Sequence, residues 1–164
     1  MTTEKAADII GTVEAAAGAG IMEKVATDKA GKILEGAKAE AAGKVMDKMS
    51  TTKLTQVIPT MKEDALTQRL PEMSAAKLYG IPKETLFAAL PHAPTEHLIR
   101  EVPPTPPPDM KPGVVTYVTA TEERYLCILT TAGEWVVVME SPIPVTRLLV
   151  KPKVELQNLG TTLK

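Results

Sequence analysis

Pairs of large apolar residues recur every twelve residues near the start of the chain. Ile9-Ile10 is followed at this spacing by Ile21-Met22, Ile33-Leu34 and Val45-Met46. On an ideal helix, twelve residues turn the chain by about 120° beyond whole turns, so one straight helix would not keep these pairs on one face. The seven-residue period of a left-handed coiled coil is absent. The pattern therefore predicts either several short helices or one weak helix wrapped by other chains.

Small residues dominate the same segment, since 18 of the 38 residues from 6 to 43 are alanine or glycine. If the segment is a series of short helices, Gly18-Ala19-Gly20 and the region near Gly36 are the expected breaks, because glycine weakens a helix interior. A segment with so few large side chains has little to bury. We therefore expect residues 1–50 to form an Ala/Gly-rich helical arm that is disordered alone and ordered in an assembly.

Residues 51–100 are predicted to form a region of short helices punctuated by proline. The expected helices are Thr60 to about Leu70, with Glu63 completing a capping box, then Pro71 to Gly80, Pro82 to Leu90, and a short one after Thr95 that contains Leu98 and Ile99.

Residues 101–113 form a predicted linker, because six of the residues from 102 to 112 are proline. Such a sequence favours polyproline II at about 3.1 Å per residue, which spans about 30 Å. Pro103–Pro106 and Pro104–Pro107 have the P-x-x-P spacing that SH3-type domains bind. The alternative is a rigid spacer or strap.

Residues 114–164 are predicted to form a small β domain. The expected strands are Val114–Ala120, Arg124–Thr130, Glu134–Glu140, Val145–Val150 and a short Val154–Leu156. Thr131-Ala132-Gly133 suits a hairpin turn with glycine in the left-handed position. Alternation places Tyr125, Cys127 and Leu129 on one face and Leu126 and Ile128 on the other. The fold class is therefore α+β, with a four- or five-stranded antiparallel meander or small barrel at the C-terminus.

Charge is nearly balanced, with 19 basic and 20 acidic residues spread evenly along the chain. No segment is basic enough to favour nucleic acid or an anionic membrane by charge alone. The first residues contain no apolar signal core, and no run approaches the length of a membrane-spanning helix. These features are compatible with the cytoplasm or a virion.

Signatures of catalysis are absent from the sequence, so we expect no enzyme, no cofactor and no small-molecule substrate. There is no nucleophile elbow, Walker loop or dinucleotide-binding glycine motif. His92 and His97 are five residues apart, which is not the spacing that places two ligands on one helical face, so no metal site is expected. Cys127 is the only cysteine and lies in a predicted strand, where a thiol is usually an inert core residue.

One segment, Met73 to Leu86, resembles the core of a helix-turn-helix, notably the pipsqueak and transposase-like type. In that family a small residue, here Ala76, lets two helices approach, Gly80 makes the turn, Ile81-Pro82 starts the second helix and Leu86 anchors it. The resemblance implies DNA binding through residues 71–90. It also implies that the second helix turns outward a set that is not basic overall: Lys83, Glu84, Phe87 and Ala88.

A second alternative is a membrane-surface protein that uses the N-terminal arm as an amphipathic helix. Its polar face would carry six lysines, but it would also carry acidic residues that anionic lipid repels.

The interpretation that unites these features is a non-catalytic structural or adaptor protein. We expect a minor or cementing component of a large assembly, such as a minor capsid protein of a virion, with other protein subunits as partners. The residues expected to bind those partners are Ile21, Met22, Ile33, Leu34, Val45, Met46, Phe87, Pro104 and Pro107.

Overall fold

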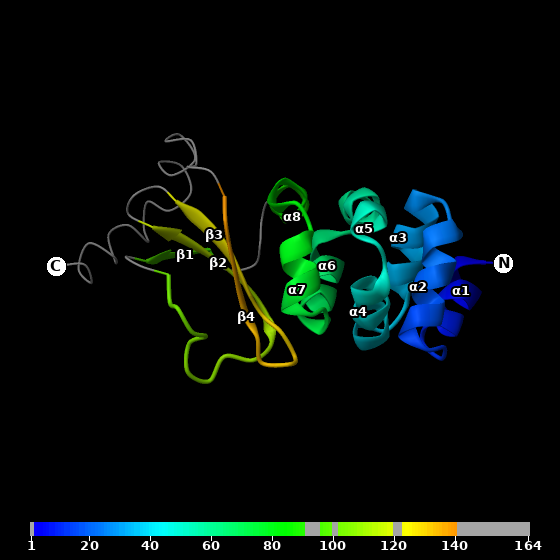
Figure 1. Ribbon diagram of the computed structural model, residues 1–164, viewed down its shortest axis with the longest axis horizontal. Helices are drawn as coiled ribbons and strands as arrows, with labels where there is room; N and C mark the ends of the chain where they lie inside the picture. Colours follow the sequence, from blue (N-terminus) through cyan, green and yellow to red (C-terminus); the bar gives the residue numbers. More distant parts are fainter. Residues whose placement is uncertain (1, 91–95, 100–101, 120–122, 141–164) are drawn as a thin grey trace.

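The computed structural model describes residues 2–90, 96–99, 102–119 and 123–140. A stack of short helices occupies one end of the molecule, and a four-stranded sheet lies across the other end of the stack (Figure 1). The proline-rich segment follows the sheet on the side away from the helices. The α+β fold class predicted from the sequence is confirmed.

Each helix is short. The α-helices are α1 Thr3–Ile10, α2 Ala15–Lys24, α3 Thr27–Gly36, α4 Ala39–Lys48, α5 Thr51–Val57, α6 Glu63–Arg69, α7 Ala75–Gly80 and α8 Lys83–Ala89, with 3₁₀ turns η1 Ile58–Thr60 and η2 Leu70–Glu72.

The twelve-residue repeat is one helix followed by two extended residues. In α2, α3 and α4 the helix has ten residues, and the residue after it is extended, as at Met49 (φ −76°, ψ 157°). Each break restarts the helical phase, so most residues of the recurrent apolar pairs point inward despite their spacing, whereas Ile21 is exposed. Several short helices were one of the two predictions, and this one is confirmed. The break expected at Gly18-Ala19-Gly20 is wrong, because these residues lie inside α2, whereas Gly36 does end α3.

Successive helices alternate between two columns, since α1 packs on α3, α2 on α4, α3 on α5 and α4 on α6 (Figure 1). Small residues allow these helices to approach closely. A Cβ atom on Gly43 would collide with the side chain of Glu72 and would lie 2.7 Å from the carbonyl oxygen of Arg69. Met22, Leu34 and Met46 are fully buried. Within the whole chain this segment is well buried, because close helices need few large side chains to fill the space between them. Its disorder when alone stays a prediction.

The polar residues of the stack also follow the repeat. A carboxylate in the last turn of one helix accepts the backbone N–H of the residue 27 positions later, which precedes a helix. The three pairs are Glu23 with Ser50 (2.6 Å), Glu35 with Lys62 (2.6 Å) and Asp47 with Ser74 (2.8 Å). The capping box expected between Thr60 and Glu63 is wrong, because α6 begins after Lys62 and its first donor is satisfied by Glu35 from another helix.

Lysine and arginine side chains donate hydrogen bonds to backbone carbonyl groups at the helix ends. Lys53 donates to the Val25 carbonyl and Lys77 to the Met49 carbonyl, both at 2.7 Å. Arg69 donates to Ala37, which occupies the same repeat position, and also to the carbonyls of Leu34 and Glu35. Positive charge at a helix C-terminus is stabilising, so these bonds fasten each helix end to a later repeat.

The sheet contains β1 Glu96–Ile99, β2 Gly113–Thr119, β3 Arg124–Leu129 and β4 Trp135–Met139, in that order. The predicted hairpin between β3 and β4 is confirmed, and Gly133 has a positive φ of 86°. The predicted antiparallel pairing of the three later strands is also confirmed. The short helix expected after Thr95 is wrong. Residues 96–99 instead pair in parallel with β2. The backbone of β2 provides hydrogen-bond partners for these residues, whereas so short a helix could form very few hydrogen bonds of its own.

Two apolar clusters lie on opposite faces of the sheet. Leu126 and Ile128 join the core of the helices, whereas Cys127 and Tyr117 form a second cluster on the outer face. The alternation predicted for Leu126, Cys127 and Ile128 is confirmed. The sheet therefore covers the end of the helical stack and completes its core.

The proline-rich residues form a strap across the outer face of the sheet. A connection between neighbouring parallel strands must cross one face. Val102 and Met110 pack on the outer cluster, and the Trp135 indole N–H donates to the Pro103 carbonyl at 2.9 Å. The strap expected for this segment is therefore present, and recognition of its P-x-x-P motifs by an SH3-type domain stays a prediction.

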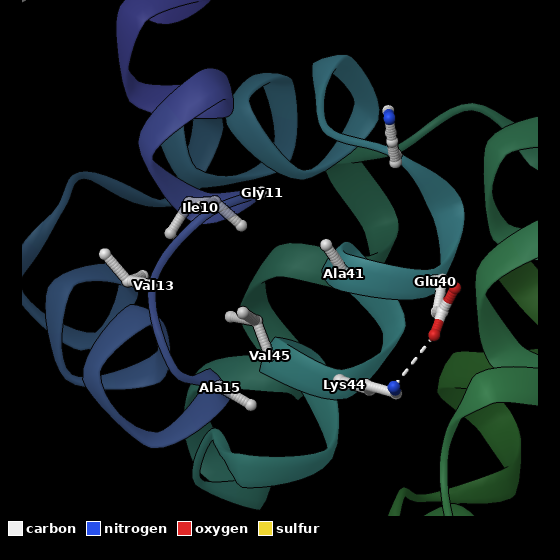
Figure 2. A pocket seen from close by; sticks show the side chains of 9 residues that line it. Ile10, Gly11, Val13, Ala15, Glu40, Ala41, Lys44 and Val45 are labelled. Atoms are coloured by element: carbon white, nitrogen blue, oxygen red, sulfur yellow. Dashed lines mark hydrogen bonds and ion pairs between the residues drawn. The ribbon is translucent and has the colours of Figure 1, made fainter.

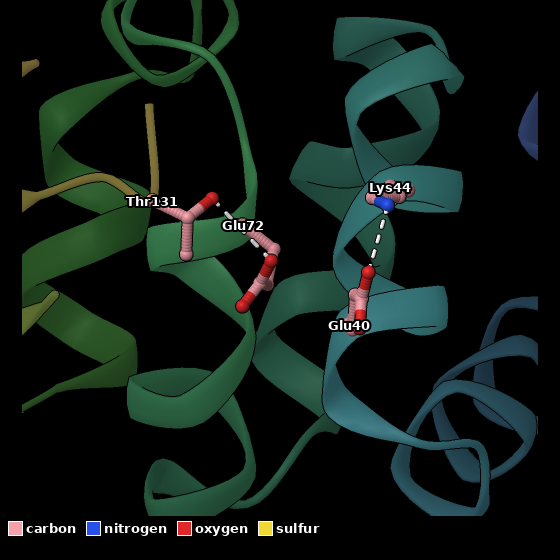
Figure 3. Close-up of polar contacts among 4 residues, drawn as sticks. All are labelled: Glu40, Lys44, Glu72 and Thr131. Atoms are coloured by element: carbon pink, nitrogen blue, oxygen red, sulfur yellow. Dashed lines mark hydrogen bonds and ion pairs between the residues drawn. The ribbon is translucent and has the colours of Figure 1, made fainter. Parts of the chain in front are cut away.

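The hairpin turn is anchored to the helices. The backbone N–H of Thr131 donates to the Pro71 carbonyl at 2.8 Å, and its hydroxyl donates to Glu72 at 3.4 Å (Figure 3). The Tyr79 hydroxyl accepts the backbone N–H of Val137 on β4. The expected strands at Val145–Val150 and Val154–Leu156 lie outside the described residues.

Candidate protein-interaction surface

Helix α2 is built almost entirely from small residues. Its buried side consists of Gly18, Ala19 and Met22 and packs on α4. A Cβ atom on Gly18 would lie only 2.8 Å from Cγ2 of Val45, so glycine is what lets α4 come this close. The side of α2 that faces α4 is therefore a well-packed part of the core.

The opposite side of α2 is apolar and exposed. Ala16, Ala17, Gly20 and Ile21 have the i, i+1, i+4, i+5 spacing of a single helical face, and all four are exposed, as is Val13 in the turn before the helix. Ile21 retains 42% of its accessible surface and Val13 retains 36%. A helix with apolar residues on both sides is usually covered on both sides.

Comparison of the repeats shows that this face is unusual. The second and sixth positions of a repeat are exposed to solvent, and most helices carry polar residues there. These pairs are Glu4 and Asp8, Asp28 and Lys32, Glu40 and Lys44, Thr52 and Gln56, and Asp64 and Gln68. In α2 the same positions hold Ala16 and Gly20. Only α7, with Ala76 and Gly80, departs in the same way among α1 to α7.

The exposure of Ile21 has a clear structural cause. Residues at the same repeat position in later helices are buried: the exposed fraction is 1% for Val45 and 0% for Val57. Val45 is covered because it lies against Gly18 of the preceding helix in its column. Among the described residues no helix precedes α2 in this column, so Ile21 has no such cover. Helix α1 begins the other column and presents Glu4, Lys5 and Asp8 outward.

A hollow of about 300 Å³ adjoins this face, between the α1–α2 turn and α4 (Figure 2). Its apolar lining includes Ile10, Val13, Ala15, Ala41 and Val45. Val13, in the turn before α2, lies on the side of Gly18 that faces α4, since a Cβ atom on Gly18 would be 3.6 Å from its Cγ2 atom. The hollow therefore adjoins the start of α2, where Ala15 lines it.

Charged residues border the hollow. Lys44 donates to Glu40 at 2.9 Å across one turn of α4 (Figures 2 and 3). This hydrogen bond, together with the opposite charge, lowers the pKa of Glu40 and raises the pKa of Lys44. Both side chains are mostly exposed, so the pair places opposite charges at the α4 side of the hollow.

The residues predicted to bind partners fall into two groups. Six of them are buried in the chain's own core and are inaccessible to a partner in this structure: Met22, Ile33, Leu34, Val45, Met46 and Phe87. Of the others, Ile21 and Pro104 are exposed and Pro107 is half-buried. The apolar pairs that suggested a partner-binding arm are in fact the contacts between its own helices.

The segment that resembles a helix-turn-helix is arranged differently from the expectation. Phe87, expected on the surface, is buried with 6% of its surface exposed, and Leu90 at the end of the same segment is 1% exposed. The ring of Phe87 lies 5.2 Å from the buried guanidinium of Arg124. The exposed Lys83 and Glu84 line a hollow that also contains Glu140, so this surface has no excess of positive charge for a phosphate backbone.

Other site chemistry is not found in the described part of the chain. No group of three or more histidine, cysteine, aspartate or glutamate side chains there is placed to hold a metal ion. None of the helices described is long and apolar enough to cross a membrane. Cys127 is fully buried, and burial raises the pKa of its thiol to about 12.

Comparison with known proteins gives no relative from which a function can be transferred. The chain matches no protein-family model, no curated protein and no solved structure.

Sequence reasoning missed the exposed face of α2, although the signal is present. Aligning all the repeats, and not only the apolar pairs, shows that Ala16 and Gly20 replace polar residues at solvent positions. That alignment depends on the repeat continuing through Val57-Ile58, Arg69-Leu70 and Ile81-Pro82, where arginine and proline obscure the apolar pattern.

Proposed function

We propose that this protein is a non-catalytic interaction module, a component of a larger protein assembly that binds another protein subunit through the exposed face of α2 and the adjoining hollow. One observation carries the proposal: α2 lacks the polar residues that α1, α3, α4, α5 and α6 have at the same solvent positions. Stacked repeats need a polar end to remain soluble alone, and this end is apolar where α2 begins its column.

The surface has the chemistry of a protein interface. Ile21 and Val13 supply apolar area, and Ala17 and Gly20 leave room for a partner's side chains to approach the helix. The charged rim made by Glu40 and Lys44 is typical of the border of such a patch. A virus particle would be one such assembly, with this protein as a minor component.

Site-specific photocrosslinking in the native cell tests this proposal. A photoreactive residue at position 17 is expected to give a discrete crosslinked protein product, and Ile21→Glu in the same chain is expected to abolish it. The matched control places the same group at position 28, which is exposed on the polar side of α3. Equal products from both positions, or none from position 17, would overturn the proposal.

A further inference from the structure

We infer that the exposed face of α2 binds the same face of a second copy of this chain, forming a two-fold symmetric dimer with the two α2 helices antiparallel. This inference rests on the proposed function and names the partner. It follows from three features of the described residues: how the helices of the stack already pack, where the charges of α2 lie, and what covers the other end of the stack.

The contact continues an interface that the stack already uses. Val45 of α4 lies against Gly18 of α2, and a Cβ atom on Gly18 would come within 2.8 Å of it. Ile21 is the equivalent of Val45 and has no glycine-rich helix to meet among the described residues. A second α2 supplies one, because its outward face carries Ala17 and Gly20. Each Ile21 thus gains the kind of contact that buries its equivalents in later repeats.

Charge selects the antiparallel arrangement. Glu14 lies at the start of α2 and Lys24 at its end, and both are exposed. When two α2 helices run antiparallel with Ile21 of one copy opposite Ala17 of the other, Glu14 of each copy lies opposite Lys24 of its partner. A parallel pair would place like charges together. The antiparallel pair also sets the two helix dipoles in opposite directions.

The other end of the stack explains why the association closes at two copies. Leu126, Ile128 and Val136 of the sheet are buried against the helices, so within residues 2–90, 96–99, 102–119 and 123–140 no apolar helical end remains there. A copy cannot add its far end to another copy's α2, which would give an open filament. Only the isologous contact of α2 with α2 is left, and such a contact forms a closed dimer.

Sedimentation velocity on the full-length chain, over about 1 to 100 μM, tests the inference in the range expected for a modest interface. The sedimenting mass is expected to rise with concentration from the 17.6 kDa of one chain to twice that value. Ile21→Glu is expected to remain a monomer throughout, with an unchanged urea midpoint, since its side chain is already partly exposed. Asp28→Lys on the polar side of α3 is the matched control and is expected to dimerise normally.

Charge exchange provides the sharper test. Glu14→Lys alone and Lys24→Glu alone are each expected to weaken the dimer several-fold, because like charges then face each other. The double variant is expected to recover most of the wild-type association. A wild-type chain that stays monomeric at every concentration, or a double variant no better than either single one, would overturn the inference. A monomer that still gives a discrete heterologous crosslink from position 17 would leave the proposed function standing and show a different partner.

Discussion

Asp47 accepts two hydrogen bonds from Ser74, one from its backbone N–H and one from its hydroxyl, both at 2.8 Å. The two residues are 27 positions apart, and Ser74 also caps α7 by accepting the N–H of Lys77 at 3.3 Å. One carboxylate therefore fixes the start of a helix that lies three helices further along the chain. Because Glu23 and Glu35 make the equivalent contacts, the repeat is held together by polar bonds as well as by apolar packing.

Removing this carboxylate is expected to destabilise the stack. Asp47→Ala leaves a part-buried backbone N–H without its acceptor and frees the capping serine, so we expect a loss of about 2 kcal/mol in the free energy of unfolding. Urea unfolding followed by circular dichroism measures it. Asp28→Ala, an exposed acid on α3, is the control and is expected to change stability by less than about 0.5 kcal/mol. Equal effects of the two substitutions would contradict a structural role for the Asp47 contact.

Arg69 is expected to be the most sensitive polar position of the stack. It is 5% exposed and donates to the carbonyls of Leu34, Glu35 and Ala37. Burial lowers the pKa of its guanidinium, and the charge of Glu35 acts in the opposite direction. Arg69→Met retains most of the apolar volume but leaves these three carbonyls, and that of Ala65 in its own helix, without this donor, so we expect a loss of about 3 kcal/mol.

The matched substitution is Lys53→Met, which removes one bond to the Val25 carbonyl. We expect it to cost about 1 kcal/mol, measured by the same urea titration. If Arg69→Met were no more damaging than Lys53→Met, the three carbonyl contacts of Arg69 would not contribute independently.

The sequence predicted the sheet better than the helices, for a physical reason. Strands β2, β3 and β4 pair with their neighbours in chain order, so alternation of apolar residues and one glycine turn were enough to place three strands and a hairpin. The pairing of Glu96–Ile99 with β2 joins segments separated by the proline strap, and local patterns carry no such information.

The helices were predicted less well because only the apolar pairs of the twelve-residue repeat were used. Several short helices were one of the two structures that the apolar pairs predicted. The break near Gly36 was placed correctly, but the one at Gly18-Ala19-Gly20 was not, because α2 ends before Val25, as α4 ends before the buried and extended Met49. Gly18 and Gly43 permit close packing instead of ending helices. The interaction surface was not predicted because it depends on a comparison between helices. Ala16 and Gly20 stand where most other helices have polar residues, and this difference is seen only when the whole repeat is aligned.

Thr116 offers a stabilising substitution. It is fully buried in β2, and within the described residues its hydroxyl has no hydrogen-bond partner. Thr116→Val keeps the shape and removes the unsatisfied group, so we expect a gain of about 1 kcal/mol. On the same strand, the hydroxyl of Thr119 accepts the backbone N–H of Glu123 at 3.2 Å. Thr119→Val is therefore expected to lose about 1 kcal/mol, and thermal unfolding of both variants should show shifts of opposite sign.

Cys127 is expected to make the protein less stable at alkaline pH. Burial raises the pKa of its thiol from 9.0 to about 12. Between these two values the unfolded chain loses the proton and the native chain keeps it, so the unfolded state binds fewer protons and stability falls as pH rises. At pH 10 the cost from this one group is about 1 kcal/mol, whereas at pH 8 it is close to zero.

Comparison with Cys127→Ala isolates this effect, because the lysines and tyrosines that also titrate are common to both chains. The free energy of unfolding of the wild-type chain should fall more between pH 8 and pH 10 than that of the variant, by about 1 kcal/mol. The native thiol should also resist an aromatic disulfide reagent at pH 8 and react at once in urea. Parallel pH dependences, or rapid reaction of the native protein, would mean that the outer face of the sheet opens far more easily than its packing under the proline strap implies.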